Sequence, residues 1–90
     1  MSKMRIEHDK VADAAYVFIK DADERRTEKL DDDRLLDRDF GGRLVGIEFL
    51  NVSRGVRVHD LPCPKKHNEI EQLLDREGIQ IRVPALAGMA

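Results

Sequence analysis

The stretch Val45-Gly46-Ile47-Glu48-Phe49 decides how the chain folds. Its apolar residues at 45, 47 and 49 alternate with glycine and glutamate, which is the pattern of a strand with one buried and one open face. The preceding Phe40-Gly41-Gly42-Arg43 predicts a hairpin loop, because glycine adopts the positive φ that such turns need. We therefore expect an antiparallel hairpin that leads into the clearest strand of the chain.

The residues before this hairpin also predict extended structure. Residues 4–7 alternate between apolar and charged side chains, and the run closes at Asp9. Residues 16–19 are apolar on both faces, as in a central strand covered on both sides. Between these strands the alanine-rich residues 11–15 predict one helical turn, with Asp9 placed to cap it. Residues 25–30 are polar and predict an edge strand.

The second half of the chain predicts one helix and a last strand. Ile70, Leu73 and Leu74 have helical spacing, and Gly78 is placed to end the helix. Two starts are open: a capping box of Asn68 with the glutamate three residues on, or Pro64 at the first helical position. Residues 79–83 then alternate as a final strand.

Together these elements predict an α+β fold: an antiparallel strand meander with a short helical turn after the first strand, then one C-terminal helix and a final strand. The helix is expected to cover one face of the sheet. Residues 1–84 are expected to form a single domain, which Pro84 closes, and residues 85–90 a loose tail.

Composition narrows the class of protein. Of 90 residues 41% are hydrophobic, the net charge is −2, and Cys63 is the single cysteine. So short a chain has a small core, and no disulfide can stabilise it. We therefore expect a homodimer, because a second copy would bury more surface. The near-neutral charge argues against general nucleic-acid binding. No export signal or membrane span is expected, which together with the lone cysteine predicts a cytoplasmic protein. No cofactor is expected.

Several segments, taken in order, resemble one family. They are residues 9–17 (Asp-Lys-Val-Ala-Asp-Ala-Ala-Tyr-Val), 27–30, 36–39 and 42–53, where a Gly-Ile-Glu strand is followed by Asn-Val-Ser. The pattern resembles the YuzE-like proteins, small bacterial proteins with no assigned function. The resemblance covers roughly residues 4–54 and implies an α+β fold in a bacterial cytosol. It implies no activity, although genes for toxin-like proteins near some members suggest an antitoxin role.

Seven residues at these positions are candidates for function or for structural motifs: Asp9, Asp13, Tyr16, Asp37, Glu48, Asn51 and Ser53. Two carboxylates brought together could share a proton or bind a divalent cation. The simpler interpretation is structural, with Asp9 as a cap and with Asn51 and Ser53 shaping the turn after the strand. No catalytic motif surrounds Ser53.

His59, Cys63 and His67 are spaced four residues apart and are weak candidates for zinc ligands. Pro62 and Pro64 prevent the continuous helix that would place all three on one face, so no metal site is predicted. The acidic run of residues 31–33 lacks the calcium-loop pattern and is expected to be a solvated turn.

Two functional hypotheses follow. The first is a homodimeric protein-interaction module, antitoxin-like in one form, with strand edges that could pair with another chain. The alternative is a small enzyme or a ligand- or metal-binding protein that uses the acidic residues near the N-terminal turn. The alternative requires Asp9, Asp13 and Glu48 to converge in one pocket.

Overall fold

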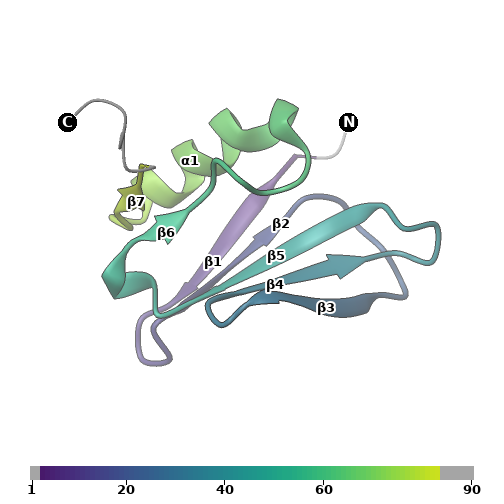
Figure 1. The fold of residues 1–90 in the computed structure, drawn as a ribbon, viewed down its shortest axis with the longest axis horizontal. Helices are drawn as coiled ribbons and strands as arrows, with labels where there is room; N and C mark the ends of the chain where they lie inside the picture. Colours follow the sequence, from purple (N-terminus) through teal and green to yellow (C-terminus); the bar gives the residue numbers. More distant parts are fainter. Residues whose placement is uncertain (1–2, 84–90) are drawn as a thin grey trace.

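The computed structural model describes residues 3–83, and the predicted C-terminal tail lies outside them. Five strands form an antiparallel sheet in the order β1-β2-β5-β4-β3, and a two-stranded parallel sheet and one α-helix lie on one side of it (Figure 1). The strands of the large sheet are β1 Arg5–Asp9, β2 Ala14–Phe18, β3 Arg26–Asp31, β4 Arg34–Arg38 and β5 Leu44–Leu50. The later elements are η1 Val52–Arg54, β6 Val56–Arg57, η2 Pro64–Lys66, α1 His67–Arg76 and β7 Ile81–Arg82. The predicted α+β class is confirmed.

Strand β5 is the centre of both the sheet and the hydrophobic core. It pairs with β2 on one side and with β4 on the other, and its residues Val45, Ile47 and Phe49 are at most 1% exposed. Ile47 and Phe49 belong to one core cluster with Ile70 and Leu74 of α1, which are fully buried. Burying such a side chain contributes about 1.5–3 kcal/mol. The alternation that predicted this strand is therefore confirmed.

The order of the strands is not that of a simple meander. Strands β3, β4 and β5 follow one another in space, but β5 then inserts beside β2, so the β1–β2 hairpin lies at the opposite edge from β3. The prediction of a meander is wrong in this respect. Strand order depends on which apolar faces meet across the core, and this is not encoded in the spacing of strands along the chain.

The helical turn predicted for residues 11–15 is also wrong. Residues 10–13 form the turn of the β1–β2 hairpin, and β2 already begins at Ala14. Asp13 has a φ of 56°, in the left-handed region, which turns the chain back on itself. Ala14 and Ala15 then pair with both β1 and β5. The two neighbouring strands override the helix propensity of alanine.

Strand β2 is covered on one face only, which corrects the expectation of cover on both. Ala15 and Val17 are buried under the helix layer, whereas Tyr16 and Phe18 on the other face are half-buried. Figure 1 shows α1 and the β6–β7 pair on one side of the large sheet, with no described element across the other side. The sheet therefore has a covered face and an open face.

Helix α1 begins at His67, directly after the 3₁₀ turn that Pro64 opens, so Pro64 stands at the first position of that turn and neither predicted start is the start of α1. Asn68 lies inside the first turn of α1, and the residue at the N-cap, Lys66, makes no side-chain capping bond within the described part of the chain. At the other end the predicted stop at Gly78 is confirmed. Its φ is 73°, and the Ile79 N–H donates to the Leu74 carbonyl at 3.0 Å, as in a Schellman motif.

The predicted final strand is shorter than expected and belongs to a different sheet. Only Ile81 and Arg82 are extended, among the described residues of that segment, and they pair in parallel with Val56 and Arg57. The β6 strand follows Gly55, whose φ of 87° redirects the chain after η1. Within residues 3–83 no helix is long and apolar enough to cross a membrane.

Candidate functional site: the open face of the sheet

The open face of the sheet carries a small set of apolar and aromatic side chains that no described element covers. The register places Ala14, Tyr16 and Phe18 of β2 on the same side as Leu50 and Glu48 of β5. Opposite Glu48 on the next strand lies Leu35, which is also half-buried. A contiguous group of apolar side chains without cover is one feature of interaction surfaces.

Tyr16 crosses this face from β2 to β4. Its hydroxyl donates a hydrogen bond of 2.5 Å to Asp37 Oδ2, and Thr27 donates another of 2.5 Å to the second oxygen of the same carboxylate. The ring passes directly over Gly46 of β5, where a Cβ atom would collide with the tyrosine hydroxyl. Arg25 donates to the same hydroxyl at 3.2 Å. A glycine on the central strand is thus what allows the tyrosine to bridge three strands.

The bridge changes the acidity of the tyrosine. Burial of the phenol, together with its hydrogen bond to the Asp37 carboxylate, raises the pKa of Tyr16 to about 12. Both causes disfavour the phenolate, because it would be desolvated and would face a negative charge. The hydroxyl is therefore a hydrogen-bond donor that positions Asp37, and it is poorly suited to act as a general base.

Phe18 lies beside Tyr16, and the Arg5 guanidinium stacks on its ring. The two ring centroids are 4.6 Å apart, and the Arg5 guanidinium lies 3.7 Å from the centroid of the Phe18 ring. Arg5 also forms an exposed ion pair of 3.2 Å with Glu7. Stacking on the ring holds the guanidinium over the face, at the edge formed by β1.

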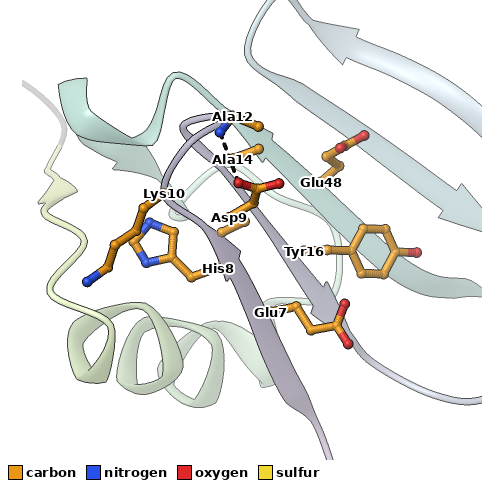
Figure 2. A pocket seen from close by; sticks show the side chains of 9 residues that line it. Glu7, His8, Asp9, Lys10, Ala12, Ala14, Tyr16 and Glu48 are labelled. Atoms are coloured by element: carbon orange, nitrogen blue, oxygen red, sulfur yellow. Dashed lines mark hydrogen bonds between the residues drawn. The ribbon is translucent and has the colours of Figure 1, made fainter.

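A shallow hollow of about 650 Å³ lies in this face between β1, β2 and β5. Figure 2 shows Glu7, Tyr16 and Glu48 on one side of β1, with His8 and Lys10 on the other. The Glu48 side chain makes no hydrogen bond or ion pair with any other residue between 3 and 83. Among the predicted site residues, Glu48 is the one whose carboxylate has no such partner in the described chain and is available to another molecule.

Asp9 also lines the hollow, but its carboxylate serves the neighbouring turn. One oxygen accepts a hydrogen bond of 2.9 Å from the Ala12 backbone N–H (Figure 2). This is the bond expected of a residue that shapes the turn. Asp9 therefore combines the structural role predicted for it with a position at the rim of the hollow.

Asp13 and Ser53 meet at the end of the sheet and not in the hollow. The Asp13 carboxylate accepts bonds from the Ser53 backbone N–H at 2.9 Å and from its hydroxyl at 2.7 Å. The Asp13 carbonyl accepts a third bond, from the Val52 N–H, at 3.1 Å. These bonds fasten the β1–β2 turn to the chain that leaves β5.

Asn51 fastens the other hairpin to the same corner. Its side-chain amide donates to the Asp33 carboxylate at 2.9 Å, and the Leu50 N–H donates to the Asp33 carbonyl at 2.7 Å. Asn51 itself has a φ of 54°, a conformation that asparagine tolerates better than most residues. The Asn-Val-Ser segment is thus a clasp between two hairpin turns, and its predicted structural role is supported by these contacts.

Arg34 forms an ion-pair network that the sequence did not reveal. Although charged, it is 4% exposed, and its guanidinium donates to the carboxylates of Asp31 and Asp60 at distances down to 2.6 Å. Arg57 adds a bond of 2.7 Å to Asp31. The network joins the β3–β4 turn to the segment after β6. The predicted turn is confirmed at Asp32 and Asp33, and Asp32 is exposed, but Asp31 ends β3 and is held by the network, so the segment is not solvated throughout.

The arginine holds both carboxylates in the ionised form. Hydrogen bonds from Arg34 lower the pKa of Asp60 to about 2 and lower the pKa of Asp31 as well. The two carboxylates in turn raise the pKa of the Arg34 guanidinium. Coupled charges of this kind often mark active sites, but here each partner is fully engaged by the others.

The weak metal candidates do not come together. His59 is exposed, Cys63 is packed against the core, and one ring nitrogen of His67 lies 2.8 Å from the Leu61 carbonyl oxygen. Burial raises the pKa of the Cys63 thiol, so the reactive thiolate is disfavoured. Within residues 3–83 no three histidine, cysteine or acidic side chains are grouped to hold a metal ion.

The fold and its uncovered face define a small two-layer α+β protein whose sheet is bridged by one tyrosine. The profile of DUF2283, a family described as proteins of unknown function, matches residues 5–53. The match spans more than half of the chain, from β1 through β5 to the clasp, so the protein belongs to the DUF2283 family. No curated protein and no solved structure matches the chain significantly. The narrower YuzE-like name remains a resemblance.

Proposed function

We propose that this protein is a homodimeric protein-interaction module that binds a partner protein on the open face of its sheet. The observation that carries the proposal is the contrast between Glu48 and the other predicted site residues. Asp13, Asp37, Asn51 and Ser53 all bond to groups of the same chain. The Glu48 carboxylate, on the uncovered face, has no hydrogen-bond or ion-pair partner within residues 3–83.

The chemistry of this face defines the partner. Glu48 is flanked across the strands by Tyr16 and Leu35, so a carboxylate lies among apolar side chains. Charge complementarity favours a protein that places an arginine or lysine against Glu48 and apolar side chains around it. An antitoxin that covers a basic surface of its target is one class of protein that works in this way.

The small size of the domain supports self-association. A chain of 90 residues buries a modest share of its surface, and both edges of the sheet are unpaired within residues 3–83. A second copy would add burial without adding chain length. We place this dimer in the bacterial cytosol, as the family resemblance and the free thiol of Cys63 suggest.

The alternative, a small enzyme or ligand-binding protein that uses the acidic residues, is less well supported. It required Asp9, Asp13 and Glu48 to converge. Asp9 and Glu48 line the same hollow, but Asp13 is held by Ser53 at the end of the sheet. Among the described residues that line the hollow, none forms a nucleophile paired with a base, and Tyr16 has a raised pKa.

The test compares partner capture by the tagged wild-type protein with capture by two matched variants. Glu48→Arg reverses the charge on the open face, and Glu69→Arg makes the same change on an exposed helix position. We expect one stoichiometric protein to be retained by the wild type and by Glu69→Arg and lost with Glu48→Arg.

The captured protein is then purified and its dissociation constant measured by calorimetry. The milder variant Glu48→Gln, which keeps the shape of the side chain, is expected to weaken binding about tenfold. Equal capture by Glu48→Arg, or no protein retained by the wild type, would refute partner binding on this face.

A further inference from the structure

Strand β1 forms one edge of the sheet and pairs with β2 alone. Its five residues run antiparallel to β2 in unbroken register from Arg5 to Asp9, without a bulge. The backbone groups on its outer side have no strand partner within residues 3–83. An edge of this kind is a template for another strand unless the sequence blocks it.

The charges along this edge form a self-complementary pattern. Lys3, two residues before β1, and Arg5 are followed at the same two-residue spacing by Glu7 and Asp9, so this edge is positive at its start and negative toward its end. All four residues are exposed. An antiparallel copy of such a strand presents the opposite sign at each position.

From this pattern we propose that two copies of the chain pair antiparallel through their β1 strands, with the two-fold axis at Ile6. This inference specifies the homodimer of the proposed function and rests on it. In this register Arg5 lies opposite Glu7 of the second copy, Lys3 lies opposite Asp9, and Ile6 lies opposite Ile6. Opposite charges at directly paired positions stabilise antiparallel strands, and like charges destabilise them.

The neighbouring registers fail on charge. Moving the axis to Glu7 places two glutamates opposite each other, and moving it to Arg5 does the same with two arginines. Parallel pairing in register would place every charge against its own kind. Only the axis at Ile6 gives attraction at both charged positions, so the sequence specifies one register of the pair.

The other edge of the sheet is less suited to pairing. Strand β3 has a register irregularity between Lys29 and Asp31, which breaks the regular ladder. Its Glu28 is already bonded to Arg38 at 2.6 Å. A bulge and engaged charges are devices that blunt an edge against association. By contrast, β1 keeps a regular ladder, and its charged side chains are exposed and bond only locally within residues 3–83: Arg5 to Glu7 and the Phe18 ring, and Asp9 to the Ala12 N–H.

The pairing also has a consequence for the open face. A two-fold axis through paired antiparallel strands is perpendicular to the sheet, so both open faces lie on the same side. The five-stranded sheet is doubled, and two Glu48 side chains face one partner surface. In the dimer the two Arg5–Glu7 ion pairs within the copies are exchanged for two between the copies, and Lys3 with Asp9 adds two more.

The experiment measures the mass of the full chain by light scattering and sedimentation over a range of concentrations. Arg5→Glu and Glu7→Arg each place like charges opposite each other twice per dimer. We expect each variant to weaken dimerisation about tenfold or more. Arg54→Glu, which changes the net charge by the same amount as Arg5→Glu at an exposed position away from β1, is expected to leave the dimer intact.

The mass of a mixture of the two variants is the decisive measurement. The Arg5→Glu chain carries glutamate at both paired positions, and the Glu7→Arg chain carries arginine at both, so the mixture is expected to recover a heterodimer. Because the two native side chains are 58% and 67% exposed, both variants are expected to fold, which circular dichroism verifies. The double variant on one chain is expected to form a homodimer again.

Three outcomes would overturn the proposal. A wild-type chain that is monomeric at every concentration refutes both the homodimer and its register, while partner binding at Glu48 is judged separately. A dimer that both variants leave unchanged refutes the β1 edge but keeps the homodimer. Two monomeric variants that do not recover association when mixed refute the register.

Discussion

On the covered face of the sheet the side chains are held by packing, whereas on the open face they are held by hydrogen bonds. Val17, Ile47 and Phe49 are completely buried in the core beneath the helix layer. On the opposite side of the same strands, Tyr16 reaches across Gly46 to the Asp37 carboxylate. Packing supplies most of the free energy of folding, and directional bonds fix how one side chain lies. The open face is thus shaped without being covered, which leaves it available to another molecule.

The largest expected effect is on the covered face. Phe49→Ala removes a fully buried ring at the centre of the core and is expected to lower the free energy of unfolding by about 3–5 kcal/mol. Phe18→Ala, the matched change on the open face, is expected to cost clearly less because that ring is only half-buried. Urea unfolding measures both. Equal losses of unfolding free energy would show that Phe18 on the open face is packed as tightly as Phe49 on the covered face.

The next effect concerns the ion-pair network at the margin of the core. Arg34→Met keeps an unbranched apolar stem but leaves Asp31 and Asp60 without their common partner. We expect a loss of about 2–3 kcal/mol, below the ~3–5 kcal/mol of a fully buried pair. The reason is that the carboxylates remain 29% and 42% exposed. Lys29→Met breaks a solvent-exposed pair and is expected to cost less than about 1 kcal/mol.

The same network predicts a dependence on acid. Arg34 lowers the pKa of Asp60 to about 2, below the ~3.9 of an unfolded aspartate. The stabilisation is therefore complete above about pH 4 and is lost as the pH falls toward 2. Urea unfolding between these values should show a steeper loss for the wild type than for Arg34→Met. Parallel pH profiles would mean that the pKa values of the carboxylates in the network do not change on unfolding.

These regions also differ in how far they could be predicted from sequence. The alternation at residues 45–49 and the glycines around it directly reflect one buried face, so that strand was identified correctly. The helical turn at residues 11–15 was predicted from alanine propensity, which strand pairing on both sides overrides. Strand order, and with it the meander, depends on contacts between distant segments that local patterns do not contain.

The candidate site was predicted residue by residue but not as an arrangement. Tyr16 and Asp37 were both singled out, yet their contact spans 21 positions and runs over Gly46, which had been assigned no role. A glycine alternating with core residues in a central strand was the available signal for a crossing side chain. Arg34 was missed because burial of an arginine depends on Asp60, 26 positions away.

A smaller effect tests the tyrosine bridge, and the chain is well suited to the measurement because Tyr16 is its single tyrosine. Its pKa of about 12 lies above the ordinary value of 10.0, so the stabilisation is complete below pH 10 and is lost as the pH rises toward 12. Titration by ultraviolet absorbance reads this group alone. In Asp37→Asn the pKa of Tyr16 is expected to move back toward 10. No movement would mean that burial alone raises it.

The smallest expected effect is at the clasp, where the two hairpin turns meet. Ser53→Ala removes the hydroxyl bond of 2.7 Å to Asp13 but keeps the backbone bond of 2.9 Å to the same carboxylate. We expect a loss of about 0.5–1 kcal/mol, the net value of one exposed hydrogen bond.

Asp13→Ala removes both bonds and places alanine at a φ of 56°, so it should cost more. Hydrogen exchange of the Ser53 amide distinguishes the two variants: it should exchange faster in Asp13→Ala, which removes its acceptor, and not in Ser53→Ala. If Ser53→Ala instead weakened partner capture at unchanged stability, the clasp would belong to the binding surface and the division between a structural end of the sheet and a functional open face would fail.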